Sequence, residues 1–270
     1  MASTLSKYRY VAAIGLQNTF VYRWNFLLRV LFGCIPLMGT FYLWRAIFRD
    51  PSARVGGYVF EGMISYFLGL ILLDSLTSPT EDDFQIAAEI RGGLINQFLL
   101  KPVDYLAYRF SLFWSYRFIY TTTTILPVFA ILFVMNHYLI WPVSFTVWIW
   151  AMLATLLSAT LQFLMAYCSA LMAFWVLDVS APIFIIFSIE HLVGGHMFPL
   201  DLFPSALYQW IMLTPFPYEY WFPLSVFLER VPQDQLASGF VMQIFWCLFF
   251  WGLARWIWSR GIRHYTAVGG

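Results

Sequence analysis

The feature that most constrains this chain is a series of long apolar runs with very few charged residues. Each run is close to, or longer than, the roughly 20 helical residues that cross a hydrocarbon core of about 30 Å. The sequence therefore predicts an all-α integral membrane protein with six transmembrane helices. The runs lie at about 26–48, 58–78, 110–136, 143–176, 181–198 and 240–258.

The composition excludes several classes of protein. Hydrophobic residues make up 61% of the chain and charged residues 11%, whereas soluble domains carry about 25% charged residues. Too little polar surface remains for a water-soluble enzyme or a disordered regulator. A nucleic-acid binder needs a concentrated basic surface, and the formal net charge is only +1. The three cysteines, Cys34, Cys168 and Cys247, lie in apolar runs without metal-ligand spacing and are expected to be buried packing residues.

The distribution of lysine and arginine predicts the orientation in the membrane. Six crossings place both termini on the same side of the membrane. If that side is the cytoplasm, eleven of the fifteen lysine and arginine residues are cytoplasmic. This bias follows the positive-inside rule, so both termini are predicted to be cytoplasmic. The external basic residues are Arg45, Arg49, Arg54 and Arg230. The internal ones are Lys7, Arg9, Arg23, Arg29, Arg91, Lys101, Arg109, Arg117, Arg255, Arg260 and Arg263.

The N-terminal residues 1–25 have the pattern of a helix that lies on the membrane surface. Leu5, Tyr8, Ala12 and Leu16 follow three- and four-residue steps, with polar residues elsewhere around the helix. A disordered tail is the alternative. No small-residue cleavage site follows a short apolar core, so the first span is expected to stay in the protein. The predicted organisation is this helix, a six-span membrane domain over 26–264 and a cytoplasmic tail over 265–270.

The longest polar segment between the predicted spans on the cytoplasmic side is 79–109. Thr80 and Asp83 have capping-box spacing, and Ile86, Ile90 and Leu94 repeat every four residues. This pattern predicts a capped helix with one apolar stripe at the cytoplasmic edge of the membrane.

The end of this helix is marked by Gly92 and Gly93, and Lys101 and Pro102 close a second short apolar piece, 94–100. The apolar stripe needs a surface to pack on. That surface could be the protein's own helical bundle or a groove on a soluble partner. The residues leave both alternatives open.

The external stretch 182–232 holds seven of the thirteen prolines and many aromatic residues. It is too apolar for a solvated loop and too often interrupted for a straight span. Irregular backbone within a membrane survives only where protein surrounds it. A re-entrant helical element over 195–232 is therefore predicted.

Glu190 and His191 lie inside the fifth predicted span. A carboxylate in the membrane interior costs about 2.5–3.5 kcal/mol on insertion scales, so it must face protein or a water-filled path. We expect Glu190, rather than His191, to face an export path or a subunit interface, with Phe187 and Val193 as apolar neighbours. A protonated or locally paired carboxyl group is the alternative. His191 and His196 have the spacing H-x-x-x-x-H, which two metal ligands could have. Two histidines and one glutamate are too few ligands to predict a metal site.

Motifs for nucleotide binding and hydrolysis are absent from the sequence. Neither lysine, Lys7 or Lys101, belongs to a G-x-x-x-x-G-K-[ST] loop, and H-E-x-x-H, G-x-S-x-G and C-x-x-C do not occur. Three functions remain open: the membrane half of an ATP-driven transporter, a self-sufficient channel or secondary carrier, and a lipid-modifying membrane enzyme. A carrier would be expected to show internal repeats, and an enzyme a cluster of acid, base or metal-binding residues. The first function accounts best for both the cytoplasmic helix and the missing nucleotide motif.

Several short motifs, in order along nearly the whole chain, resemble the permeases of type-2 ABC exporters. Their bacterial branch has members about as long as this chain. The motifs are EIRGGL at 89–94, LLKPV at 99–103, GHMFPLDLFP at 195–204, TPFP at 214–217 and RHYTAVGG at 263–270.

This resemblance implies a permease dimer, of identical or related chains, on two ABC ATPase subunits in the bacterial inner membrane. It implies no cofactor in this chain, because ATP and Mg²⁺ would bind the ATPase, and it names no substrate. Segment 79–109 becomes a coupling segment to the ATPase, and 195–232 a re-entrant segment. The coupling residues would be Asp83, Ile86, Glu89, Ile90, Arg91, Gly92, Leu94, Lys101 and Pro102. The re-entrant motif would be set by Gly195, Pro199, Pro204, Pro215 and Pro217.

Overall fold

The computed structural model describes residues 23–50, 52–77 and 82–265. Within these residues the regular secondary structure is helical, apart from an isolated bridge between Val55 and Tyr58. The predicted all-α class is confirmed. The predicted surface helix over 1–25, the predicted cap Thr80 and the tail after residue 265 fall almost wholly outside the described residues.

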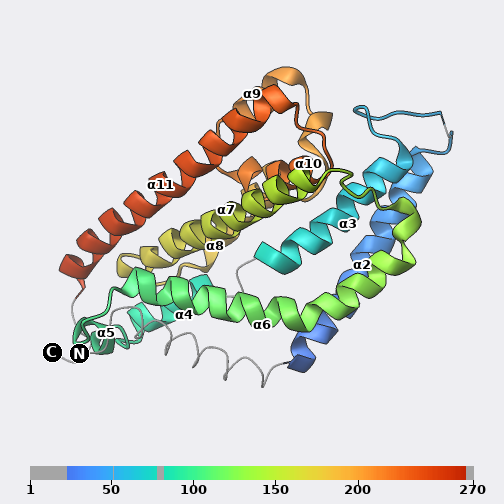
Figure 1. Cartoon of the computed structure of the whole chain (residues 1–270). Helices are drawn as coiled ribbons and strands as arrows, with labels where there is room; N and C mark the ends of the chain where they lie inside the picture. Colours follow the sequence, from blue (N-terminus) through green and yellow to red (C-terminus); the bar gives the residue numbers. More distant parts are fainter. Residues whose placement is uncertain (1–22, 51, 78–81, 266–270) are drawn as a thin grey trace.

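Six helices correspond to the six apolar runs (Figure 1). By length and composition, α3, α7 with its extension η3, and α11 can each cross a membrane, and the bent α6 adds a fourth candidate among the described residues. The helix α8 is shorter, with 14 residues. The six are α2 (Arg23–Ile47), α3 (Phe60–Thr77), α6 (Tyr105–Val134), α7 (Phe145–Ala170, continued by η3, Leu171–Phe174), α8 (Ser180–Val193) and α11 (Gln233–His264).

The helix α6 bends by 49° between its parts Tyr105–Thr122 and Pro127–Val134. Pro127 has no N–H for the helical hydrogen bond, and its ring crowds the preceding turn, which is the usual cause of such a bend. The carboxylate of Asp104 caps the start of α6 by accepting a hydrogen bond from the Ala107 N–H at 2.9 Å. A short 3-10 helix, η2 (Asn136–Tyr138), follows its end.

The central helix of the fold is α7, which packs against α3, α4 (Asp82–Arg91), α10 (Trp221–Phe227) and α11. Two apolar cores lie along it. One core, at the end that carries α4, joins α4, α6, α7, η3 and α11, and the other joins α2, α3, α7 and α10. We call these ends of the bundle the α4 end and the α10 end. Apolar side chains on the outer side of α11, such as Val241 and Leu248, remain exposed, as expected of a helix that faces lipid.

The segment between α8 and α11 consists of short helices with irregular connections. Pro204 directly precedes α9, and Pro215 and Pro217 stand at the start of η5, so prolines mark helix starts where a missing N–H costs little. Every residue of α10 is buried. The short helices are η4 (Leu200–Leu202), α9 (Ser205–Ile211), η5 (Phe216–Tyr218) and α10 (Trp221–Phe227).

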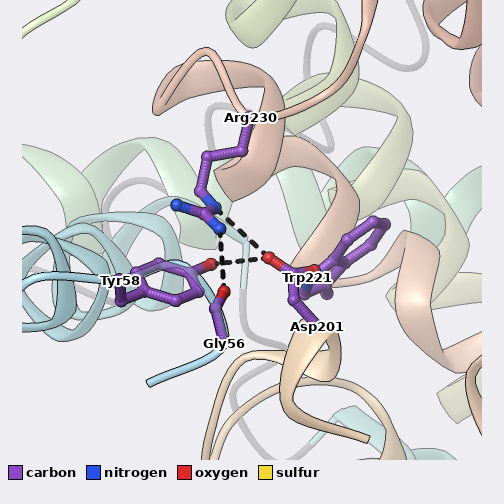
Figure 2. A network of polar contacts seen from close by, with 5 residues as sticks. All are labelled: Gly56, Tyr58, Asp201, Trp221 and Arg230. Carbon is purple, nitrogen blue, oxygen red and sulfur yellow. Dashed lines mark hydrogen bonds and ion pairs between the residues drawn. The ribbon is translucent and has the colours of Figure 1, made fainter. Parts of the chain in front are cut away.

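A polar network centred on Asp201 ties this segment to the connection before α3, at Gly56 and Tyr58 (Figure 2). One oxygen of Asp201 accepts hydrogen bonds from the Tyr58 hydroxyl at 3.0 Å and from Nε of Arg230 at 3.2 Å, and the other accepts from the Trp221 indole N–H at 3.1 Å. The Arg230 guanidinium lies 3.5 Å from the Tyr58 ring centroid and donates to the Gly56 carbonyl. Burial, and then the charge of Asp201, raise the pKa of Tyr58, so its hydroxyl stays protonated and acts as a donor.

This network predicts the effect of the substitution Asp201→Asn. The amide keeps the size of the side chain but cannot accept from three donors as a carboxylate does. We expect the free energy of unfolding to fall by about 2 kcal/mol, a value reduced for the partial exposure of the ion pair. Chemical denaturation of the purified chain in detergent measures this change.

The matched control is Asp234→Asn, on the exposed first turn of α11. We expect this substitution to change the free energy of unfolding by no more than about 0.5 kcal/mol, because only an interaction with the helix dipole is lost. Equal destabilisation by both substitutions would contradict the role of the Asp201 network.

Candidate functional site

The first group of predicted site residues lies on α4, and its apolar face packs on the protein's own bundle. Ile86 and Ala87 are fully buried and Ile90 is nearly so, within the core that α4 shares with α7 and η3. Of the two alternatives left open by the sequence, the structure shows packing on the bundle. The helix ends at Arg91 as predicted, and Gly93 adopts φ of 75°, a left-handed conformation that favours glycine.

The prediction that Leu94 continues the apolar stripe was wrong. Leu94 is half exposed, because the turn at Gly93 ends the helical repeat before that position. Ile95 is fully buried instead, and its N–H donates to the Glu89 carbonyl at 3.2 Å. The short helix α5 (Asn96–Leu99) follows, and then Lys101 and Pro102, which are both exposed.

Glu89 connects α4 to α6 through a largely buried polar cluster. Its carboxylate lies 2.9 Å from Nη2 of Arg109 and accepts a hydrogen bond from the Tyr105 hydroxyl at 2.7 Å. Nε of Arg109 donates to the same hydroxyl at 3.1 Å, and the Arg109 side chain is only 1% exposed. Arg91 makes a second link, from Nη1 to the Leu177 carbonyl in the connection before α8. A movement of α4 would therefore act directly on α6 and α8.

The opposite face of α4 is exposed among the residues that the structure describes. Phe84, Gln85, Ala88 and Arg91 are exposed along it, and Gly92 follows. The residues of the predicted coupling segment are thus divided: Ile86, Glu89 and Ile90 hold α4 to the bundle, while the exposed residues form a surface. Figure 1 shows α4 and α5 together at the end of the bundle where α11 ends.

The second group of predicted residues borders a cleft of about 1010 Å³ between α2, α3, α7 and α8. It extends from Asp83 and Phe84 of α4 to His196 and Tyr220 in the segment after α8. Glu190 and His191 both line it. The expectation that only Glu190 would face inward was wrong, because a cleft of this size borders more than one face of α8.

The histidines next to the cleft stack on one another and on an aromatic ring. The rings of His191 and His196 have centroids 4.8 Å apart, and the ring of His196 lies 3.7 Å from that of Tyr220. Phe187 stacks on the other side of His191, at 5.8 Å. Within the described residues, no group of three or more side chains that could ligate a metal is present.

Glu219 is the main cleft residue that sequence reasoning missed. Its side chain is 1% exposed, it lines the cleft, and its carboxyl group interacts directly with that of Glu190. Its main-chain carbonyl accepts hydrogen bonds from the Ser158 hydroxyl and from Nε2 of Gln162. The available signal was an acid within the apolar, proline-rich stretch TPFPYEYWFP, which is the same signal that singled out Glu190.

Two further contacts fix the irregular backbone around Glu219. Nε2 of the fully buried Gln243 donates to the Tyr218 carbonyl at 2.9 Å, and the Trp221 N–H donates to the Gly194 carbonyl at 3.0 Å. These bonds fold the chain after α8 back against the start of α10.

Gly195, a residue of the predicted re-entrant motif, is required by close packing. It has φ of 98°, and its carbonyl accepts a hydrogen bond from the Tyr66 hydroxyl at 2.6 Å. A Cβ at this position would lie 2.6 Å from that hydroxyl oxygen, so only glycine fits. Pro199, Pro204, Pro215 and Pro217 do not line the cleft, and they shape the segment that ends it.

Comparison with known proteins identifies the family of this chain. A search of curated proteins gave no match. The sequence model of the family described as "ABC-2 family transporter protein" matches residues 34–269. The match includes every helix from α3 to α11 and most of α2. The chain is therefore a multi-pass membrane transport subunit that belongs to the ABC-2 transporter family.

Proposed function

We propose that this chain is the permease subunit of an ABC exporter and forms the translocation path as a dimer with an identical or related chain. Separate ABC ATPase subunits bind ATP and Mg²⁺ and hydrolyse the nucleotide. The observation that carries the proposal is the family match over 34–269, together with a sequence that has no phosphate-binding loop. All six long apolar helices, α8 included, cross the membrane in this proposal.

The α4 end is the cytoplasmic end, and both termini lie on that side. Arg91, Lys101, Arg255, Arg260 and Arg263 lie on or near α4, α5 and the last turns of α11, as the positive-inside rule requires. In the bacterial inner membrane, this places the segment around α9 and α10 toward the outside, as a re-entrant element. Its buried α10 and satisfied backbone bonds support that placement.

The helix α4 is the coupling helix. Its exposed face, with Gln85 and Ala88, meets the ATPase, while its buried face passes the motion to the bundle. The Glu89–Arg109 ion pair carries the motion to α6 and the packing of Ile90 carries it to α7 and η3. ATP-driven closure of the ATPases then rocks the helices as rigid bodies.

The cleft forms one wall of the export path, and the second permease forms the other. Apolar side chains of α8 next to the cleft, Phe184, Ile185 and Phe187, are more than half exposed, which supports burial against a second chain or lipid. A carboxyl group at Glu190 faces this path rather than acyl chains, in agreement with its cost in lipid.

The proposal is tested by purifying the tagged chain from its native membrane, with and without high-salt washing to remove peripheral subunits. We expect an ABC ATPase to co-purify and the complex to hydrolyse ATP, while the washed chain does not. ATP hydrolysis by the washed chain alone would contradict the proposal.

The two faces of α4 give a matched cross-linking prediction. Ala88 is exposed and its neighbour Ala87 is fully buried, so the two cysteine substitutions differ only in direction. We expect Ala88→Cys to cross-link to the ATPase in the assembled complex, and Ala87→Cys to remain unreacted. Gel electrophoresis after treatment with a short bifunctional maleimide measures both. Absence of a cross-link from Ala88→Cys in an active complex would exclude α4 as the contact.

The ion pair of Glu89 gives a second prediction, for the substitution Glu89→Gln. The amide keeps its shape but loses the charge that holds Arg109. Changes within a coupling network shift coupling by about 0.5–2 kcal/mol, so the permease-dependent part of the ATPase rate should fall roughly 2- to 30-fold. Size-exclusion chromatography should show an intact complex.

The control for this substitution is Glu61→Gln, on the exposed first turn of α3. It should leave the permease-dependent ATPase rate unchanged. If Glu89→Gln behaves like this control, the ion pair does not transmit the motion.

A further inference from the structure

The cleft has an uneven charge: carboxylic acids line it, and the basic side chains among the described lining residues are the two histidines His191 and His196. Four carboxylic acids, Asp74, Asp83, Glu190 and Glu219, contribute to its walls, and no lysine or arginine does so among the described residues. The nearby Arg117 points elsewhere, because its Nη2 donates to the backbone carbonyl of Ser75 at 2.9 Å. A ligand beside Glu190 and Glu219 therefore meets two acids without a lysine or arginine among the described lining residues.

Glu219 is a second and independent sign of a ligand. Apart from the carboxyl group of Glu190, no N–H or O–H group of the described residues donates to its carboxyl oxygens, although the side chain is 99% buried. Its hydrogen-bonding partner is thus another acid, and a buried carboxylate without a positively charged partner is costly. The backbone bonds from Ser158 and Gln162 hold Glu219 in this position, so the group cannot relax away from the cleft.

The walls around the carboxyl pair are apolar and aromatic. Phe67, Phe84, Phe187 and Tyr220 border the cleft. Aromatic faces attract cations through their quadrupoles, most strongly where water is excluded. The volume of about 1010 Å³ is at the upper end of the range for sites that bind drug-sized molecules.

We propose that this cleft binds an amphipathic organic cation, with the Glu190–Glu219 carboxyl pair as its counter-charge and the aromatic walls as its apolar contact. An anion such as a phosphate headgroup would meet the Glu190–Glu219 pair without a lysine or arginine among the described lining residues. The proposal rests on the proposed export function and names the class of substrate. A cation that enters the cleft supplies the positive counter-charge that Glu219 lacks among the described residues.

The test uses two ions of nearly the same shape and opposite charge, tetraphenylphosphonium and tetraphenylborate. Equilibrium dialysis measures their binding to the full chain in uncharged lipid nanodiscs at neutral pH, after subtraction of binding to empty nanodiscs. We expect saturable binding of tetraphenylphosphonium and none of tetraphenylborate. Failure of tetraphenylphosphonium to bind, or equal saturable binding of both ions, would overturn the proposal whatever the variants do.

The variants Glu219→Gln and Glu190→Gln then locate the site. Each keeps the shape of the side chain and removes a charge, so each should weaken binding of the cation by at least about tenfold, which corresponds to about 1.4 kcal/mol. Glu61→Gln, outside the cleft and exposed, should bind as the unchanged chain does. Unchanged affinity in both cleft variants, with normal size-exclusion profiles, would refute the assignment of the carboxyl pair.

The outcome is separate from that of the export function, because the binding measurement needs no ATPase. If the chain assembles with an ATPase but does not bind the cation, the proposed export function stands and the proposed substrate class is wrong. If the chain binds the cation but assembles with no ATPase, the proposed binding site stands and the proposed export function is wrong.

Discussion

Irregular backbone inside an apolar bundle is the constraint on which much of this structure depends. The chain between α8 and α11 leaves helical geometry repeatedly, yet α10 and its neighbours are buried. With no water to satisfy them, the free carbonyl groups must find donors in the surrounding helices. Ser158 and Gln162 of α7 and Gln243 of α11 supply these donors to Tyr218 and Glu219. Polar residues in otherwise apolar helices are thus explained by the backbone that they hold.

The same hydrogen bonds also position an acidic group of the cleft. By fixing the main chain at Glu219, they hold a carboxyl group against that of Glu190, which comes from a separate helix. Neither acid would remain in this position on a mobile loop, since a solvated position costs a carboxylate far less. The structure therefore keeps two acids together at the wall of a large cleft, and the bonding that keeps them there is also the bonding that lets the segment fold.

The two ends of the bundle are anchored differently. At the α10 end, Asp201 joins Trp221 and Arg230 of its own segment to Tyr58, which precedes α3. At the α4 end, α4 is held through one buried face and the Glu89–Arg109 pair, and its other face is exposed. A force applied to that exposed face would move α4 with the helices it contacts, against an opposite end that is held by several converging bonds. This asymmetry suits rigid-body motion about the α10 end.

The sequence by itself determined the all-helical class, the approximate bounds of the long helices, the end of α4 at Gly92 and the family resemblance. These follow from local properties: hydrophobic run length, helix-breaking residues and short motifs. It also singled out Glu190, because a charge in an apolar run is visible without coordinates. The sequence did not indicate the roles of Asp201 and Glu219. It predicted that Leu94 belongs to the buried apolar stripe of α4, whereas Ile95 is the residue that is buried there. Those features depend on which distant residues meet, such as Glu190 with Glu219 or Tyr58 with Arg230. Only the tertiary structure decided them, because spacing along one helix carries no information about the groups that another segment brings to it.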